Sequence, residues 1–211
     1  MYQPMFSFFR RFAAIAALLL ALPVFAAEGY AVFEPARPTE NPDKIEVIEF
    51  FYYTCSFCKT LNSPLAAWAA KQPKDVVLRR IPVTFGKAAL GNLARLYYSL
   101  EAMGELDRLD PQIFEAMHEQ RINLILEQKM FEWLANKGVN TQKFAGLFKS
   151  FGVESKIRRG DQLERDYQIN GVPALVIDGK YMPDPAPPEK LLAVTDQLIA
   201  KVRMERAAKK K

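Results

Sequence analysis

Residues 45–58 of this 211-residue chain read Ile45-Glu46-Val47-Ile48-Glu49-Phe50-Phe51-Tyr52-Tyr53-Thr54-Cys55-Ser56-Phe57-Cys58. Apart from Glu46 and Glu49, the first ten positions carry β-branched or aromatic side chains on both faces, which is typical of a strand buried from two sides. Apolar residues at helical spacing follow the second cysteine. We therefore predict a strand over 44–53, a short turn, and a helix over 54–71 whose first turn carries both sulfurs.

Glu49 is unexpected in such a strand. A carboxylate at this position either lies on a face that is not buried, or it is a buried titratable group with a raised pKa. An ordinary glutamate at the edge of the strand is the simpler alternative. The sequence leaves both interpretations open.

Cys55 and Cys58 are the only cysteines of the chain. Three residues apart at a helix start, they lie on the same face and can form or open a disulfide with little movement. Cys55 is nearer the free N–H groups and the positive end of the helix dipole, which favour its thiolate. Cys58 lies one turn in and is placed to resolve a mixed disulfide. This pattern predicts a redox-active dithiol.

A structural disulfide and half of a zinc site are the alternatives for this pair. Closing so short a loop removes little chain entropy, so a purely structural bridge would stabilise little. Zinc needs more ligands than the chain offers, because His118 is its only histidine. A lone histidine in a helical region is more often structural than catalytic. We expect no metal and no separate cofactor, the cysteine pair itself being the redox group.

Residues 1–26 have the pattern of a secretory signal peptide. Arg10 and Arg11 precede an apolar run over 12–22, which is too short to span a bilayer, and small residues precede a cleavage point after Ala26. An uncleaved membrane anchor is the alternative. In a bacterium-like context, export would deliver the protein to the periplasm, where disulfides form and persist.

The formal charge of +5 falls to +3 when Arg10 and Arg11 leave with the signal peptide. Basic residues gather at the carboxyl end, where the chain finishes in Lys209-Lys210-Lys211. No basic patch with interleaved aromatic residues accompanies a nucleic-acid-binding motif. We therefore expect no nucleic-acid partner and interpret the basic end as a solvated helical tail.

The rest of the chain follows the order β-α-β, helices, β-β-α, which is an α/β class. Residues 76–85 predict a second strand, parallel to the first because a helix joins them. Residues 87–168 predict an inserted helical subdomain of four or five helices with a break at Gly152-Val153. Strand pattern returns at 174–177, Asp178-Gly179 is a hairpin signal, and 189–206 form an amphipathic helix. The two sheet-forming parts are 27–86 and 169–211.

Two segments carry a family resemblance. They are residues 47–58, quoted above, and Gly171-Val172-Pro173-Ala174-Leu175-Val176-Ile177-Asp178-Gly179-Lys180-Tyr181. Both are similar to the DsbA family of periplasmic thiol:disulfide oxidoreductases of the thioredoxin superfamily, and the resemblance covers about residues 30–205. It implies a thioredoxin fold in which 27–86 and 169–211 form the thioredoxin-like domain and 87–168 the insertion.

The resemblance also implies roles for particular residues. Cys55 would attack and Cys58 would resolve. Pro173 would follow a cis peptide bond, and Val172 would offer backbone hydrogen bonds to an extended substrate peptide. Glu49 would be the buried acid beneath the dithiol that moves protons to or from Cys58.

One departure concerns the pair between the cysteines, where the family typically has Pro-His and this chain has Ser56-Phe57. In the family the histidine stabilises the reactive thiolate and makes the protein oxidising. Phe57 has no side-chain donor, and Ser56 offers only a neutral dipole. We therefore predict a weaker oxidant than a Pro-His member.

The sequence favours a monomeric oxidase that passes its disulfide to unfolded or reduced exported proteins. A membrane quinone-linked oxidase of the DsbB type would then re-oxidise the dithiol. One alternative is an isomerase or reductase kept reduced by another partner. Another is a non-catalytic peptide-binding or chaperone module on the same fold, and replacing Cys55 with serine separates that possibility from catalysis.

Overall fold

The computed structural model describes residues 29–209, so the predicted signal peptide over 1–26 lies outside the described part. Its centre is a five-stranded mixed sheet in the order β1-β5-β4-β2-β3. Only β2 and β3 are parallel, and the other neighbours are antiparallel. The strands are β1 (Tyr30–Val32), β2 (Ile45–Phe51), β3 (Val76–Pro82), β4 (Ala174–Ile177) and β5 (Tyr181–Pro183).

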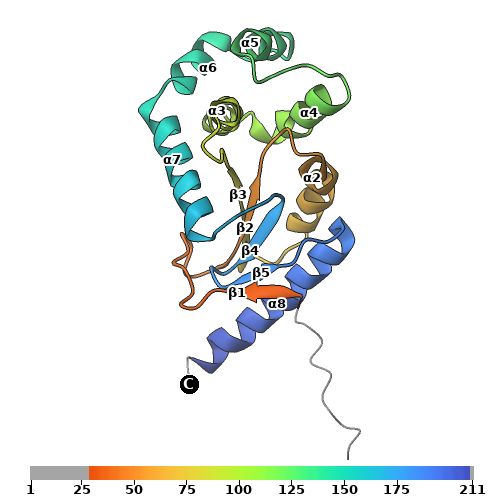
Figure 1. The fold of residues 1–211 in the computed structure, drawn as a ribbon, viewed down its shortest axis with the longest axis vertical. Helices are drawn as coiled ribbons and strands as arrows, with labels where there is room; N and C mark the ends of the chain where they lie inside the picture. Colours follow the sequence, from red (N-terminus) through yellow and green to blue (C-terminus); the bar gives the residue numbers. More distant parts are fainter. Residues whose placement is uncertain (1–28, 210–211) are drawn as a thin grey trace, which may run out of the picture.

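Helices cover both faces of the sheet and extend beyond one end of it (Figure 1). Helices α2 (Ser56–Ala69) and α8 (Pro188–Ala208) pack on one face, and the end of α7 (Phe151–Asp166) packs on the other. The remaining helices gather with α7 as a block at one end of the molecule: α3 (Ala88–Met103), α4 (Leu106–His118), α5 (Glu127–Asn136) and α6 (Thr141–Phe148). This confirms the predicted thioredoxin fold with a helical insertion. No helix within 29–209 is both long and apolar enough to cross a bilayer.

Strand β2 is the centre of the molecule, because all seven of its side chains are buried. Val47 packs against the apolar faces of α2 and α8. Ile48 and Phe50 point to the opposite face, where they pack around Tyr167 just after α7. The prediction of a strand buried from two sides is confirmed.

The predicted helix break at Gly152-Val153 is wrong, because Gly152 lies inside the first turn of α7. The break falls two residues earlier, where the Ser150 hydroxyl accepts a hydrogen bond from the backbone N–H of Val153 at 3.2 Å. A serine cap satisfies one of the free N–H groups of a new helix. The hydroxyl at 150, rather than the glycine at 152, therefore decides where α7 begins.

The hairpin between β4 and β5 forms at Asp178-Gly179, as predicted. Both residues have positive φ, at 54° and 66°. A side chain on Gly179 would place its Cβ 2.1 Å from the carbonyl oxygen of Arg37. The backbone N–H of Arg37 also donates to the Gly179 carbonyl at 2.8 Å. Only glycine fits this turn, because the segment before β2 passes directly over it.

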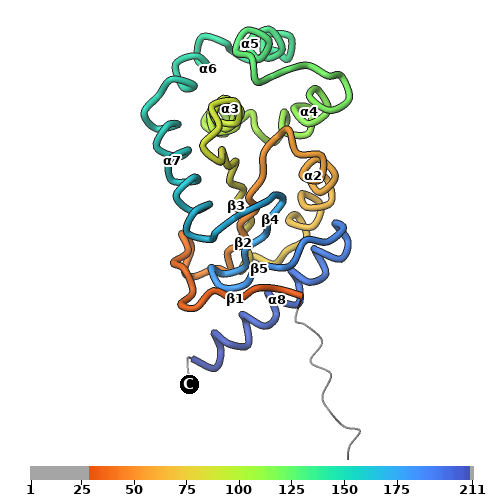
Figure 2. Tube along the Cα trace, viewed as in Figure 1, coloured from red at the N-terminus to blue at the C-terminus, as the bar shows by residue number. Residues whose placement is uncertain are grey.

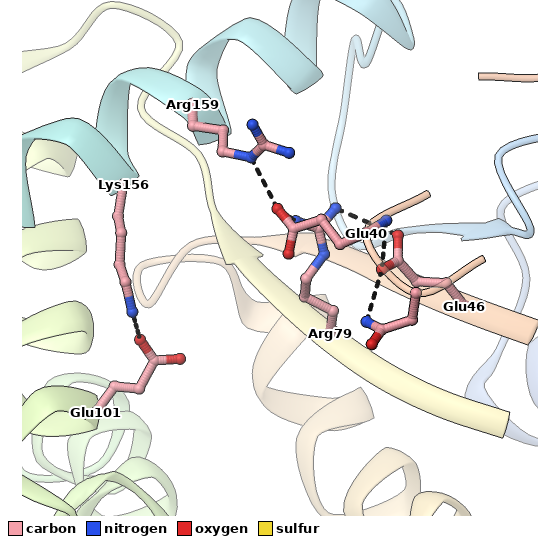
Figure 3. Close-up of polar contacts among 7 residues, drawn as sticks. Glu40, Glu46, Arg79, Glu101, Lys156 and Arg159 are labelled. Atoms are coloured by element: carbon pink, nitrogen blue, oxygen red, sulfur yellow. Dashed lines mark hydrogen bonds and ion pairs between the residues drawn. The ribbon is translucent and has the colours of Figure 1, made fainter. Parts of the chain in front are cut away.

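A buried carboxylate of β2, Glu46, holds the segment before the strand in place (Figure 3). It accepts hydrogen bonds from the Glu40 backbone and the Asn41 amide, and it pairs with Arg79 at 3.3 Å. Arg79 and Arg159 both reach Glu40, at 2.6 and 2.8 Å. The network thus ties the lead-in chain, β3 and α7 together on the face away from α2.

Candidate active site

The dithiol lies where the sheet meets the helical insertion. The turn after β2 carries the chain toward α3 and α4 (Figure 2), and both cysteines share one apolar cluster with residues of those helices. Cys55 is the N-cap of α2, with φ −83° and ψ 119°. Its Sγ accepts a hydrogen bond from the Cys58 backbone N–H at 3.1 Å, and both residues are free thiols. The sulfurs therefore stand one helical turn apart in a mostly apolar setting.

The two thiols differ in their electrostatics. Hydrogen bonds from the Cys58 side chain and from the backbone N–H groups of Cys58 and Phe57 lower the pKa of Cys55 from 9.0 to about 7, although burial opposes them. Burial raises the pKa of Cys58, and its hydrogen bond to Cys55 raises it further. Cys55 is 7% exposed and Cys58 is fully buried. The arrangement favours ionisation of Cys55 and keeps Cys58 a thiol.

The loop before β4 lies directly against the dithiol. The Val172–Pro173 peptide bond is cis. The Cys55 thiol donates to the carbonyl oxygen of Val172, with Sγ and O 3.5 Å apart. The structure thus brings together the two sequence segments that carry the family resemblance, although 117 residues separate the two partners of this bond.

Glu49 is fully buried, so it is not a glutamate at the edge of the strand. Its Oε2 accepts from Nε of Arg80 at 2.5 Å. Burial raises the pKa of Glu49 above its usual value even though the guanidinium of Arg80 lowers it. The negative charge of Glu49 in turn raises the pKa of both cysteines. Glu49 is thus a buried carboxylate whose charge acts on the dithiol.

Sequence reasoning missed the partners of Glu49. Arg80 also donates to Oδ2 of Asp110 at 2.8 Å, and its guanidinium stacks over the Phe51 ring at 4.4 Å. The Tyr53 hydroxyl donates to Oδ1 of Asp110 at 2.7 Å. A signal for Arg80 existed, because the parallel register pairs it directly with Glu49. No local pattern marks Asp110, which belongs to the helical insertion.

Ser56 and Phe57 face outward from the first turn of α2. Ser56 is exposed, and Phe57 is 74% exposed. Phe57 contributes to stabilising the Cys55 thiolate through its backbone N–H and not through its side chain, because the phenyl ring has no donor. The pair therefore leaves an apolar side chain, rather than a charged one, beside the reactive sulfur.

His118 closes α4 against the turn that carries the dithiol. Its Nε2 donates to the carbonyl oxygen of Tyr53 at 2.7 Å, and its ring packs on Phe114. Next to it, Glu119 forms an ion pair with Lys59 of α2. His118 thus holds the turn in place. Among residues 29–209, no group of three or more His, Cys, Asp or Glu is placed to hold a metal.

A low-pKa thiol one turn from a buried partner thiol is suited to disulfide exchange. On a thioredoxin fold, with a cis-proline loop against the sulfurs, it defines a thiol:disulfide oxidoreductase. Residues 46–194 match the model of the DSBA-like thioredoxin domain family. The chain belongs to this family.

Similar proteins agree over most of the chain. The thiol:disulfide interchange protein DsbA of Bordetella parapertussis is 39% identical over 90% of this chain and 94% of its own length. The thiol:disulfide interchange protein DsbA of Pseudomonas aeruginosa strain PAO1 is 35% identical over 88% of this chain and 88% of its own length. The crystal structure of Pseudomonas aeruginosa DsbA covers 87% of this chain and 95% of its own, with 34% identity and a TM-score of 0.80. For the Neisseria meningitidis oxidoreductase NmDsbA1 the TM-score is 0.77 at 29% identity, over 86% of this chain and 95% of its own.

Proposed function

We propose that this protein is a periplasmic oxidase that introduces disulfides into exported proteins through Cys55 and Cys58. A substrate thiolate attacks Sγ of Cys55 in the oxidised protein, the Cys55–Cys58 bond breaks, and Cys58 leaves as a thiolate. A second substrate thiolate then attacks the substrate sulfur of this mixed disulfide, and Cys55 leaves as a thiolate. The substrate gains one disulfide, and two electrons pass to the protein.

One observation carries this proposal: Sγ of Cys55, at the N-cap of α2, accepts the Cys58 backbone N–H at 3.1 Å while Cys58 is fully buried, so that the pKa of Cys55 is lowered and that of Cys58 is raised. A thiol of lower pKa is the better leaving group. Cys55 is thus released readily from the mixed disulfide, and its thiolate favours the reduced protein. Both effects drive the disulfide toward the substrate.

The surroundings of the sulfurs supply the other roles. Val172 and Pro173 lie against Cys55, where Val172 can offer backbone groups to an extended substrate chain. Glu49, when protonated, gives its proton to the Cys58 thiolate as that sulfur leaves. The redox-active disulfide is the only redox group the reaction needs, and the protein acts as a monomer.

The partners follow from the chemistry of the family. Substrates are unfolded or reduced exported proteins, which reach the protein after its own export through residues 1–26. Each turnover leaves a dithiol that an oxidant must restore, and we assign this step to a membrane quinone-linked oxidase of the DsbB type. Support for this partner comes from the relatives, which are named DsbA.

Trapping the mixed disulfide tests the proposal. In Cys58→Ser, the Cys55 thiolate should form a stable mixed disulfide with a peptide whose cysteine carries an activated disulfide, because no resolving thiol remains. In Cys55→Ser, the buried Cys58 should form none, and oxidation of a reduced two-cysteine peptide by the protein should fall to the uncatalysed rate. Non-reducing electrophoresis and mass spectrometry measure both. Equal trapping by the two variants, or oxidation that survives in Cys55→Ser, would refute the proposal.

Restoring a donor at position 57 should make the protein more oxidising. In Phe57→His, the imidazole can donate a charge-assisted hydrogen bond to the Cys55 thiolate, worth about 1.5–3 kcal/mol. For a two-electron couple this raises the reduction potential by about 30–60 mV. Equilibration in a glutathione series, followed by tryptophan fluorescence, gives the potential. Phe57→Leu is the control, because it removes the ring without adding a donor, and an unchanged potential in Phe57→His would contradict the argument.

A further inference from the structure

The charged cluster beneath the dithiol contains two carboxylates and one guanidinium. Arg80 extends from β3 between Glu49 of β2 and Asp110 of α4, with contacts of 2.5 and 2.8 Å. An arginine side chain keeps its proton in a protein, so it cannot serve as the proton carrier. If both carboxylates ionise, the cluster has a net charge of −1 in a buried place. One carboxylate must therefore accept a proton more readily than the other.

The hydrogen bonds decide which carboxylate this is. Both oxygens of Asp110 have donors, the Tyr53 hydroxyl at 2.7 Å and Arg80 at 2.8 Å. Glu49 has one partnered oxygen, while its buried Oε1 has no hydrogen-bond partner within residues 29–209. Donors stabilise an ionised carboxylate, and a buried lone pair without a donor destabilises it. Glu49 is thus the carboxylate with fewer donors, and the one to be protonated.

We propose that Asp110 is a positioning residue for the exchange reaction, which keeps Glu49 able to carry a proton by placing a second negative charge beside Arg80. The Asp110 anion holds one side of the guanidinium and adds a second negative charge to the cluster. Because Nη2 of Arg80 is buried without a hydrogen-bond partner among residues 29–209, Asp110 acts on Glu49 through its charge and not by removing a donor. This inference rests on the proposed function in one respect: the proton that Glu49 carries is delivered to Cys58.

The groups around Glu49 agree with this division. Asp110 raises the pKa of Glu49 and Arg80 lowers it, both smaller effects than burial. The titratable and charged groups that surround the cluster come from β3, α4, α3, the turn after β2 and α2: Arg80, Asp110, Tyr97, Tyr53, Cys55 and Cys58. The tyrosines are neutral at physiological pH, because burial raises their pKa values. Asp110 is thus the acidic neighbour of Arg80, besides Glu49, that can be replaced without changing a cysteine.

The experiment is a carbon-13 NMR titration of side-chain carboxyl groups in the reduced full-length protein. Glu49→Gln identifies the Glu49 signal. In Asp110→Asn the titration midpoint of Glu49 should move to lower pH by at least about half a unit, roughly a threefold loss of proton affinity. Asp107→Asn, one turn earlier on the exposed side of α4, should leave it unchanged. A midpoint that stays or rises in Asp110→Asn overturns the proposal.

A second measurement needs no variant at Asp110, so it stands even if Asp110→Asn fails to fold. In the wild-type protein, the Glu49 signal, identified by Glu49→Gln, should titrate above the usual pH range of a glutamate, and a midpoint within or below that range overturns the proposal. Neither titration uses a substrate. Their failure would therefore leave disulfide exchange untouched, whereas failure of the Cys58→Ser trap would remove the proposed function and leave the carboxylate pair as observed.

Discussion

Replacing Arg80 with methionine should lower the free energy of unfolding of the reduced protein by about 3–5 kcal/mol at neutral pH. The side chain is only 16% exposed, and its removal leaves Glu49 and Asp110 buried together without their cation. Methionine fills a similar volume over the Phe51 ring, so the loss measures the uncompensated charge more than a cavity. Urea unfolding followed by circular dichroism gives the free energy.

The pH dependence of this loss distinguishes charge from packing. Without Arg80 the burial of Glu49 is no longer opposed by a cation, so its native-state pKa rises further above the unfolded value, and the penalty is present at neutral pH and shrinks as the pH falls and Glu49 binds a proton. Arg159→Met is the control, because Arg159 is 64% exposed in its ion pair with Glu40 and should cost less than about 1 kcal/mol. A loss in Arg80→Met that is the same at pH 4 and pH 7 would show that packing, not charge, is responsible.

The free energy of unfolding of the reduced protein should rise by about 3 kcal/mol relative to that of Cys55→Ser as the pH rises from below 7 to above 9. The pKa of Cys55 is lowered from 9.0 to about 7 in the native state, first by its hydrogen bond with Cys58. A lowered acid pKa contributes stability that is fully present above the unfolded value and is lost as the pH falls through the folded value. Serine is the matched control because it can still cap α2 but does not titrate in this range.

Unfolding free energies of the two proteins under reducing conditions, measured across this range, test the expectation. The ultraviolet absorbance of the thiolate should show a midpoint near pH 7 in the same wild-type protein. Cys58 is present in both proteins, so the titration of its own thiol largely cancels in the difference. A difference that stays constant from pH 6 to pH 9 would mean that the thiolate of Cys55 is not stabilised by the fold.

Local pattern was enough to predict the elements around the dithiol. The unbroken β-branched and aromatic run of β2 requires burial from both sides, and the structure buries every one of its side chains. Asp178-Gly179 is a specific signal for a hairpin turn, because few residues adopt the positive φ angles that both positions have. The nearness of Val172 to Cys55 followed from the family resemblance rather than from pattern. The segments around the dithiol could therefore be recognised in the sequence.

The supporting residues could not be predicted in the same way. Asp110 reaches Tyr53 across 57 residues, from a helix whose own pattern shows only an amphipathic segment. A charged residue on such a helix is normally solvated, and only the packing of the insertion on the sheet turns it inward. Ser150 was missed because a nearby glycine gave the stronger local signal for a break. Long-range packing and competition between neighbouring signals account for both errors.

The two edges of the sheet have a consequence for a protein that meets unfolded chains. An edge strand with free backbone groups can recruit another extended chain and start aggregation. Strand β1 has only three residues, and β3, at the other edge, carries Arg79 and Arg80 and ends at Pro82, which has no N–H to donate. Extended polypeptides are thus discouraged from adding to the sheet, so that under the proposed function a substrate chain can meet the loop at Val172 without being captured by an edge strand.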